Sequence, residues 1–235
     1  MTNKLNTTDL AQFVLEDSRI FKDEKCPFKG FLHYGDNPNI LVIVGENSSG
    51  KSLVFKMMAQ WAKKTLNLSP ITISIRERTG SGSFESSSFR KIVMFGDESE
   101  QSTGATSVSA VLRGFKSANS NNESILMLDE PEIGLSSGYS SALGELIGRE
   151  TLTSFNSPES YCKGVVIVTH DRNLVKGICS QLESTPSFLC MNKNLNLNEW
   201  LESSETRTIE DLINLKQISS TSRKAVNSIL NSITS

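Results

Sequence analysis

Short apolar runs alternate along this chain with segments in which apolar residues recur every three or four positions. The runs are bounded by turn-forming residues, which is typical of buried strands. They occupy 39–44, 71–75, 91–95, 124–129, 164–170 and 187–191. Strands separated by helices usually pair in parallel, because each helix returns the chain to the same edge of the sheet. The pattern predicts an α/β fold with a mostly parallel sheet flanked by helices.

Helical spacing is clearest in two segments between these runs, and each is predicted to be a helix with one buried face. The spacing is carried by Val54, Met57, Met58 and Trp61 in the first segment and by Val108, Val111, Leu112 and Phe115 in the second. The Met and Trp side chains are therefore assigned to the core rather than to cofactor contacts.

The C-terminal region 195–235 also shows helical character. Thr208 and Asp211 have the spacing of a capping box, and apolar residues recur at helical spacing from Val226 to Ile233. We expect two short helices here that pack on the domain or bind a partner. The chain is interpreted as one domain, 1–235, with an N-terminal segment 1–38 and this helical tail packed on it.

The composition of the chain limits the expected cellular location and the expected classes of binding partner. The 24 basic and 26 acidic residues give a net charge of -2, so no overall positive field attracts nucleic acid or an anionic membrane. The four cysteines are widely separated and form no CxxC pair, which favours reduced thiols. No window approaches the ~20 apolar residues of a membrane span, and the N-terminus lacks an apolar leader. We expect a soluble, cytoplasmic protein without membrane contact.

The sequence "GENSSGKS" matches G-x-x-x-x-G-K-[ST] and lies between a predicted strand and a predicted helix. Glycines allow a tight loop whose backbone N–H groups face a phosphate, and the following helix directs its positive end at the same anion. Lys51 would bridge the β- and γ-phosphates, and the Ser52 hydroxyl would bind Mg²⁺. The expected ATP-binding residues of this loop are Gly45, Glu46, Asn47, Ser48, Ser49, Gly50, Lys51, Ser52 and Leu53.

Two later strand ends carry the remaining candidate chemistry. Asp129 ends an apolar strand and would hold Mg²⁺ directly or through water. Glu130 follows it, and in an extended chain its side chain points away from that of Asp129, toward a water that attacks the γ-phosphate. His170 ends the strand "VVIVTH", where a neutral imidazole would hydrogen-bond the γ-phosphate. The proposed catalytic residues are Glu130, His170 and Lys51.

The order of "GENSSGKS", "QSTGATS", "LMLDEPEIGLS" and "VIVTHD" resembles that of ABC-type ATPases, which are P-loop NTPases. The sequence "DEPEIGLS" is more similar to the corresponding motif of the SMC, RecF and OLD branch, or of small stand-alone relatives in phage genomes, than to that of transporter subunits. The resemblance implies that Lys51 and Ser52 belong to Walker A, Asp129 and Glu130 to Walker B, and that His170 is the switch histidine. It implies a compact ABC-ATPase-like head.

In such ATPases the signature motif precedes Walker B by one helix and binds the γ-phosphate held by the opposite protomer. Ser102, Thr103 and Gly104 occupy that position here, immediately before the helix 108–115. They are therefore expected to complete the ATP site of a second copy in an ATP-dependent homodimer. A simpler interpretation is a helix N-cap, which needs only a Ser or Thr, and both roles are compatible.

The sequence departs from the family pattern at several positions. No Gln occurs from 61 to 100, so Glu85, Asp97 or another polar side chain would replace the Q-loop glutamine. Ser136 stands where transporters have the D-loop aspartate, and Thr103 where the signature usually has glycine. The short interval between Walker A and Walker B leaves no room for a long coiled-coil arm.

Three functions are compatible with these residues. The first is an ATPase that dimerises around ATP and Mg²⁺ to drive or gate an unidentified protein partner or DNA. The second is an ATP-gated interaction module with negligible turnover, suggested by the missing glutamine and the altered signature. The third is a small-molecule kinase whose lid would be 79–88, flanked by Arg76, Arg78 and Arg90. The short basic segments are more typical of solvated faces than of a DNA site.

Overall fold

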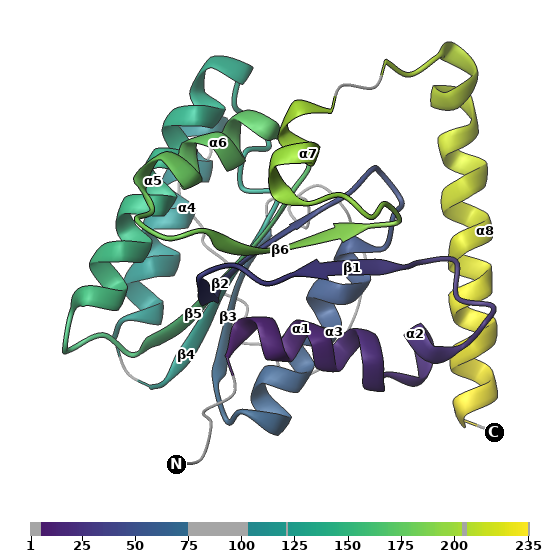
Figure 1. Ribbon diagram of the computed structural model, residues 1–235, viewed down its shortest axis with the longest axis horizontal. Helices are drawn as coiled ribbons and strands as arrows, with labels where there is room; N and C mark the ends of the chain where they lie inside the picture. The colour runs from purple at the N-terminus through teal and green to yellow at the C-terminus, as the bar shows by residue number, and fades with distance from the viewer. Residues whose placement is uncertain (1–5, 75–102, 121, 204–205, 235) are drawn as a thin grey trace.

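The computed structural model describes residues 6–74, 103–120, 122–203 and 206–234. Its centre is a six-stranded sheet with the order β1-β6-β2-β5-β4-β3 (Figure 1). The strands are β1 (Gly30–His33), β2 (Asn37–Val44), β3 (Ser69–Ser74), β4 (Ser124–Asp129), β5 (Cys162–Thr169) and β6 (Pro186–Met191). The α/β class and the mostly parallel sheet predicted from the apolar runs are confirmed.

Among the described strands, five run in the same direction, and only β1 pairs antiparallel, with β6. The register places Val44 opposite Thr169 and Asp129 opposite Val168. Ser74 at the end of β3 pairs with Asp129. The carboxyl ends of β2, β5, β4 and β3 therefore lie side by side, and the residues that follow them meet at one edge of the sheet.

Helices cover both faces of the sheet (Figure 1). In β2, Ile40, Val42 and Val44 face one cluster, while Leu41 and Ile43 face the other. Both faces of the central strands are thus apolar, which explains why these strands appear as unbroken apolar runs in the sequence. Helices α4, α5 and α6 contribute to the first cluster, and α1 and α3 to the second.

Two helices precede the strands, and the others lie between and after them. The helices are α1 (Thr7–Asp17), α2 (Arg19–Lys22), α3 (Lys51–Thr65), α4 (Thr103–Ala118), α5 (Ser137–Asn156), α6 (Arg172–Gln181), α7 (Leu197–Glu202) and α8 (Ile209–Thr234). The two helices predicted from spacing correspond to α3 and α4. Helix α1 packs on α3 through an apolar stripe, and it begins with a capping box between Asn6 and Asp9.

Two elements differ from the expectations. Strand β1 was not predicted, because it is only four residues long and none of its residues is fully buried. The predicted strand 91–95 and the loop 79–88 with its flanking arginines lie outside the described residues. The remaining predicted strands correspond to β2 to β6 within the part of the chain that the structure describes.

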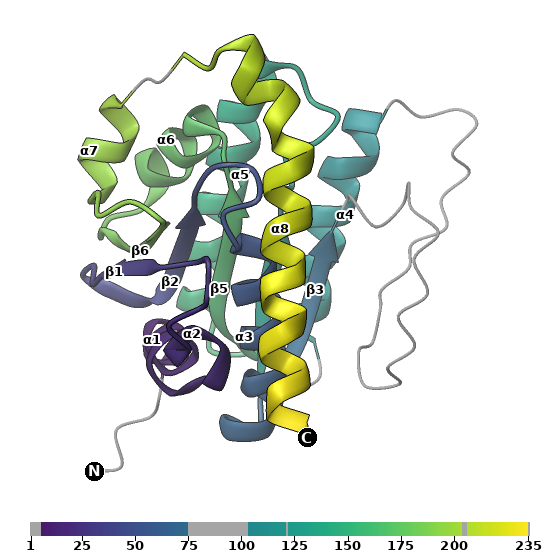
Figure 2. The same cartoon turned by 90° about the vertical axis from the view of Figure 1, so that its right-hand side faces the viewer.

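After α7, the C-terminal tail forms one long helix, α8, over the range where we expected a pair of short ones. The intervening stretch is rich in Ser and Thr but contains no Pro or Gly, so nothing in it breaks a helix. The predicted capping pair is present, with Asp211 N donating to Thr208 Oγ1 at 3.1 Å. Val226 and Ile229 pack toward the domain, whereas Leu212 at the other end is 67% exposed. Helix α8 runs along the outside of the molecule (Figure 2).

Two expectations about the whole chain can be compared with the structure. All four cysteines are free thiols, as the spacing indicated. Within the described ranges, none of the helices combines the length and apolar character needed to cross a membrane.

Candidate functional site

The loop that joins β2 to α3 has a backbone that only particular residues tolerate. Gly45, Ser48 and Gly50 have positive φ angles of 155°, 63° and 96°. A Cβ on Gly50 would lie 2.6 Å from the Phe28 ring, and a Cβ on Gly45 would lie 2.5 Å from Ser49 Oγ. Both glycines are therefore required by close approach as well as by conformation.

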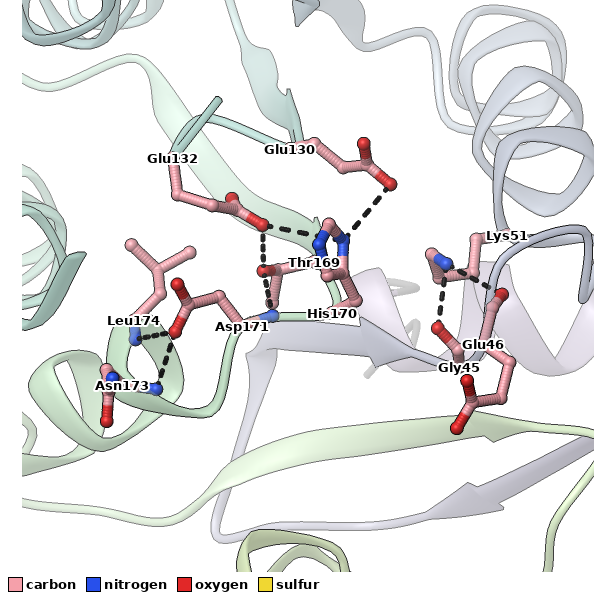
Figure 3. A network of polar contacts seen from close by, with 10 residues as sticks. All are labelled: Gly45, Glu46, Lys51, Glu130, Glu132, Thr169, His170, Asp171, Asn173 and Leu174. Carbon is pink, nitrogen blue, oxygen red and sulfur yellow. Dashed lines mark hydrogen bonds and ion pairs between the residues drawn. The ribbon is translucent and has the colours of Figure 1, made fainter. Parts of the chain in front are cut away.

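Lys51 opens α3, and its side chain folds back over this loop (Figure 3). Its Nζ donates to Gly45 O at 2.8 Å and to Glu46 O at 3.0 Å. The side chain is only 5% exposed, so the ammonium is held against the loop instead of extending into solvent. This arrangement places a buried positive charge next to the N-terminus of a helix.

The other polar side chains of the loop differ in burial. Ser49 is buried, and its Oγ has no hydrogen-bond partner among the described residues. Ser52, one residue after Lys51, is exposed. A buried hydroxyl without a partner and a neighbouring ammonium are features that suit an anion with several acceptor oxygens.

Asp129 and Glu130 lie at the end of β4. Asp129 is largely buried and accepts a hydrogen bond from Ser74 Oγ at 3.2 Å. Glu130 N donates to Val168 O at 2.8 Å, so the ladder with β5 continues through that peptide group. The φ of Glu130 is 49°, which is left-handed. The expected extended backbone at Glu130 is therefore wrong, because the chain turns here into the loop that precedes α5.

This turn directs Glu130 toward His170, which follows β5. His170 Nδ1 lies 3.5 Å from Glu130 Oε1 (Figure 3). The hydrogen bond with Glu130 is the main factor that raises the pKa of His170 above 6.5, desolvation opposes it, and the negative charges of Glu130 and Glu132 add to it. Compared with a free histidine, the protonated form is favoured, whereas the sequence suggested a neutral imidazole.

Glu132 is a site residue that the motifs did not indicate. It is 6% exposed, and its Oε1 accepts a hydrogen bond from Thr169 Oγ1 at 2.5 Å and lies 3.9 Å from His170 Nδ1. Burial raises the pKa of Glu132 more than the Thr169 hydrogen bond lowers it. The only sequence signal was an acidic residue two positions after Glu130, and its contact with β5 depends on the strand register.

A small cavity of about 170 Å³ connects the loop to the end of β5. It is lined by Gly45, Glu46, Asn47, His170, Arg172 and Trp200. Arg172 lies over the Trp200 ring at 4.8 Å and donates to Trp200 O at 3.0 Å, so α7 is fixed beside the cavity. Arg172 and Trp200 were not predicted, because nothing in the sequence places α7 next to this loop.

Of the predicted signature residues, Thr103 and Gly104 lie in the first turn of α4. Ser102 lies outside the described residues, as do Glu85 and Asp97. Helix α4 begins at Thr103, and the atoms closest to a Cβ on Gly104 belong to Leu135 and Gly134. The start of α4 therefore packs on the loop after Glu130.

The last two expectations concern the D-loop position Ser136 and the binding of a metal ion. Ser136 is the N-cap residue of α5, but its side chain makes no capping hydrogen bond. Within the described ranges, no three His, Cys, Asp or Glu side chains are arranged to hold a metal ion. The predicted Mg²⁺ ligands Ser52 and Asp129 would each supply oxygen, and Mg²⁺ usually retains water and phosphate oxygens as its other ligands.

Neither protein-family models nor curated proteins give a match to this sequence. The interpretation of the site therefore depends on the order of the motifs and on the geometry described above.

Proposed function

We propose that this chain binds ATP with Mg²⁺ on the loop 45–53 and hydrolyses it as an ABC-type ATPase with a P-loop NTPase fold. One observation carries the proposal. The buried Lys51 ammonium, the Asp129 carboxylate and the Glu130–His170 pair come from three separate segments, which follow β2, β4 and β5, and the parallel sheet brings these segments to one edge.

Phosphate binding is supported by the loop itself. Positive φ angles at Gly45, Ser48 and Gly50 curve the backbone in the way a phosphate-binding nest requires. Lys51 is buried, and the acceptors of its Nζ include two carbonyl oxygens of the loop. A phosphate is a stronger acceptor than a carbonyl, so the ammonium would exchange a loop carbonyl for a phosphate oxygen.

Ser52 and Asp129 are the residues that would hold Mg²⁺. A bound Mg²⁺ would neutralise charge on the phosphate oxygens. Asp129 is kept in place by Ser74 at the end of the neighbouring strand. That hydrogen bond fixes the carboxylate at the sheet edge.

Glu130 is the group that would orient the attacking water and accept its proton. It is 1% exposed and lies within reach of His170, whose pKa is raised by their hydrogen bond. A protonated His170 beside the loop adds a positive charge where the terminal phosphate would carry its negative charge.

The proposal includes a second copy of the chain. Ser102, Thr103 and Gly104 would contact the nucleotide held by the opposite protomer, and Gly104 packs against Gly134 and Leu135 in the loop after Glu130. Closure of two copies around ATP would drive or gate a protein partner or DNA. The chemistry of that partner is not specified by the site.

Lys51→Ala tests nucleotide binding. Lys64→Ala is the matched control, because Lys64 is an exposed lysine in the last turn of the same helix. Loss of one charge-assisted contact should weaken Mg-ATP binding by about tenfold or more and reduce phosphate release further. Calorimetry and a phosphate-release assay measure the two effects, and the control should resemble the unmodified chain.

Equal ATP affinity and equal turnover in Lys51→Ala and the unmodified chain would contradict the proposal. If only the unmodified chain binds ATP and its single-turnover rate equals that of Lys51→Ala, the site is instead an ATP-gated module without hydrolysis.

A further inference from the structure

We propose that Glu132 is a positioning residue of this site, which together with Thr169 holds His170 so that Nδ1 faces carboxylates and Nε2 remains available to the bound nucleotide. The identity of that nucleotide rests on the proposed function. The positioning itself concerns only contacts within this chain.

A short chain of hydrogen bonds connects Glu132 to the backbone on the far side of His170 (Figure 3). The Asp171 N–H donates to Thr169 Oγ1 at 2.9 Å, and Thr169 Oγ1 donates to Glu132 Oε1 at 2.5 Å. A hydroxyl has a single proton, so donation to Glu132 orients its lone pairs toward Asp171. Glu132 thereby fixes the residues on both sides of His170.

The same carboxylate also faces the imidazole. Glu130 Oε1 and Glu132 Oε1 lie 3.5 and 3.9 Å from His170 Nδ1. Two acceptors near one ring nitrogen require that nitrogen to carry the proton. Nε2 is then the nitrogen left for the cavity that His170 lines with Gly45 and Asn47.

The protonation of His170 determines whether Nε2 can donate a hydrogen bond or only accept one. With Nδ1 protonated in a neutral ring, Nε2 is only an acceptor and cannot donate to a phosphate oxygen. With both nitrogens protonated, Nε2 donates as well. The charged groups around His170 are Glu130 and Glu132, which favour the imidazolium, and Lys51, which opposes it. Glu46 and Arg172 line the same cavity.

The burial of Glu132 supports a role beyond packing. Its Oε2 is buried and has no hydrogen-bond partner among the described residues. A carboxylate in such surroundings is costly, and an apolar side chain would fill the space at lower cost. A cationic His170 offsets that cost, so the position of Glu132 is best explained by its action on the imidazole.

The test uses the full chain without nucleotide and ¹⁵N-detected NMR of the imidazole nitrogens. Glu132→Gln keeps the shape and an acceptor for Thr169 but removes the charge. The midpoint of the His170 titration should move to lower pH, and the proportion of Nδ1-protonated ring should fall. Glu159→Gln, which removes an exposed carboxylate, is the control and should leave both unchanged.

Thr169→Val and Thr169→Ser provide a second pair that does not alter Glu132. Valine removes the hydroxyl donor and should shift the His170 resonances, whereas serine retains the donor and should preserve them. With ATP, Glu132→Gln should lower turnover by about tenfold, the scale of one charge-assisted hydrogen bond, without a change in ATP affinity.

Unchanged His170 titration and tautomer in both Glu132→Gln and Thr169→Val would overturn the positioning role. This result is distinct from failure of the proposed function. If the unmodified chain neither binds nor hydrolyses ATP, the function is wrong, and the NMR comparison still decides whether Glu132 positions His170.

Discussion

Ser48 and Glu130 share a backbone conformation that side chains other than glycine, asparagine and aspartate seldom adopt. Their φ angles are 63° and 49°. Two other described residues with positive φ are Asn67 and Asn192, for which this region is common. Ser and Glu do not favour this left-handed region as Asn does. The backbone strain at Ser48 and Glu130, about 1–2 kcal/mol each, must therefore be offset by the surrounding structure. Both strained residues lie at the candidate site.

The protonation of His170 leads to a prediction about pH. Its folded-state pKa lies above the ordinary value of 6.5, mainly because of the Glu130 hydrogen bond. A raised pKa contributes stability that is fully present below pH 6.5 and is lost as the pH rises through the folded-state value. The destabilisation caused by His170→Gln should therefore be largest below pH 6.5 and decrease at higher pH.

Urea unfolding of the unmodified chain and of His170→Gln at a series of pH values measures this difference. The contribution of Glu132 to stability also decreases as the pH rises, because burial raises its pKa above 4.5. This decrease begins above pH 4.5. Unfolding of Glu132→Gln at the same pH values distinguishes the contribution of Glu132 from that of His170. A difference that increases from pH 6 to pH 8 would contradict the assignment of an imidazolium.

Helices α5 and α6 approach closely through a pair of glycines. A Cβ on Gly144 would lie 2.1 Å from Leu174 O, and a Cβ on Gly177 would lie 2.1 Å from Ser141 O. Both contacts involve backbone atoms, so a rotamer change cannot relieve them. Gly144→Ala should lower the free energy of unfolding by roughly 1–3 kcal/mol, the cost of overpacking, as measured by chemical denaturation.

Gly138→Ala is the control for this prediction, since Gly138 lies in the same helix and an added Cβ meets nothing within 4 Å. It should raise the free energy of unfolding by about 0.5–1 kcal/mol through helix propensity. Equal effects of the two substitutions would show that helix propensity, and not the contact between α5 and α6, determines the result.

The elements that the sequence predicted are those with a strong local pattern. The strands β2, β4 and β5 are buried on both faces and therefore appear as unbroken apolar runs. Strand β1 is short and half-buried, so its apolar pattern is weak, and its pairing with β6 depends on residues far away in the chain. The long helix α8 was divided in two because its Ser-rich middle has low helix propensity, although nothing in it forces a break.

The residues of the site likewise divide into those predicted from local sequence motifs and those placed by contacts between distant parts of the chain. The loop 45–53, Asp129, Glu130 and His170 were predicted because each occurs in a motif that is contiguous in the sequence. Glu132, Arg172 and Trp200 were missed, because their positions depend on the register of β4 with β5 and on the packing of α7. The turn at Glu130 was missed because the motif suggests an extended strand end.

At the scale of the whole molecule, we propose that two copies of this chain close around ATP. The start of α4 is tied to the loop after Glu130 by the Ser107 Oγ hydrogen bond to Ile133 O at 2.9 Å. A change at Glu130 on hydrolysis would therefore reach the surface that is proposed to contact the other copy. The small net charge of -2 does not strongly oppose association of two identical chains.

The most direct test is the mass in solution of Glu130→Gln with Mg-ATP, measured by light scattering after size exclusion. Glutamine keeps the shape of the side chain but cannot accept a proton from water, so ATP should remain bound and hold the dimer together. We predict about twice the monomer mass with ATP and the monomer mass with ADP. A monomer in both nucleotides, with ATP turnover equal to that of the unmodified chain, would contradict the account.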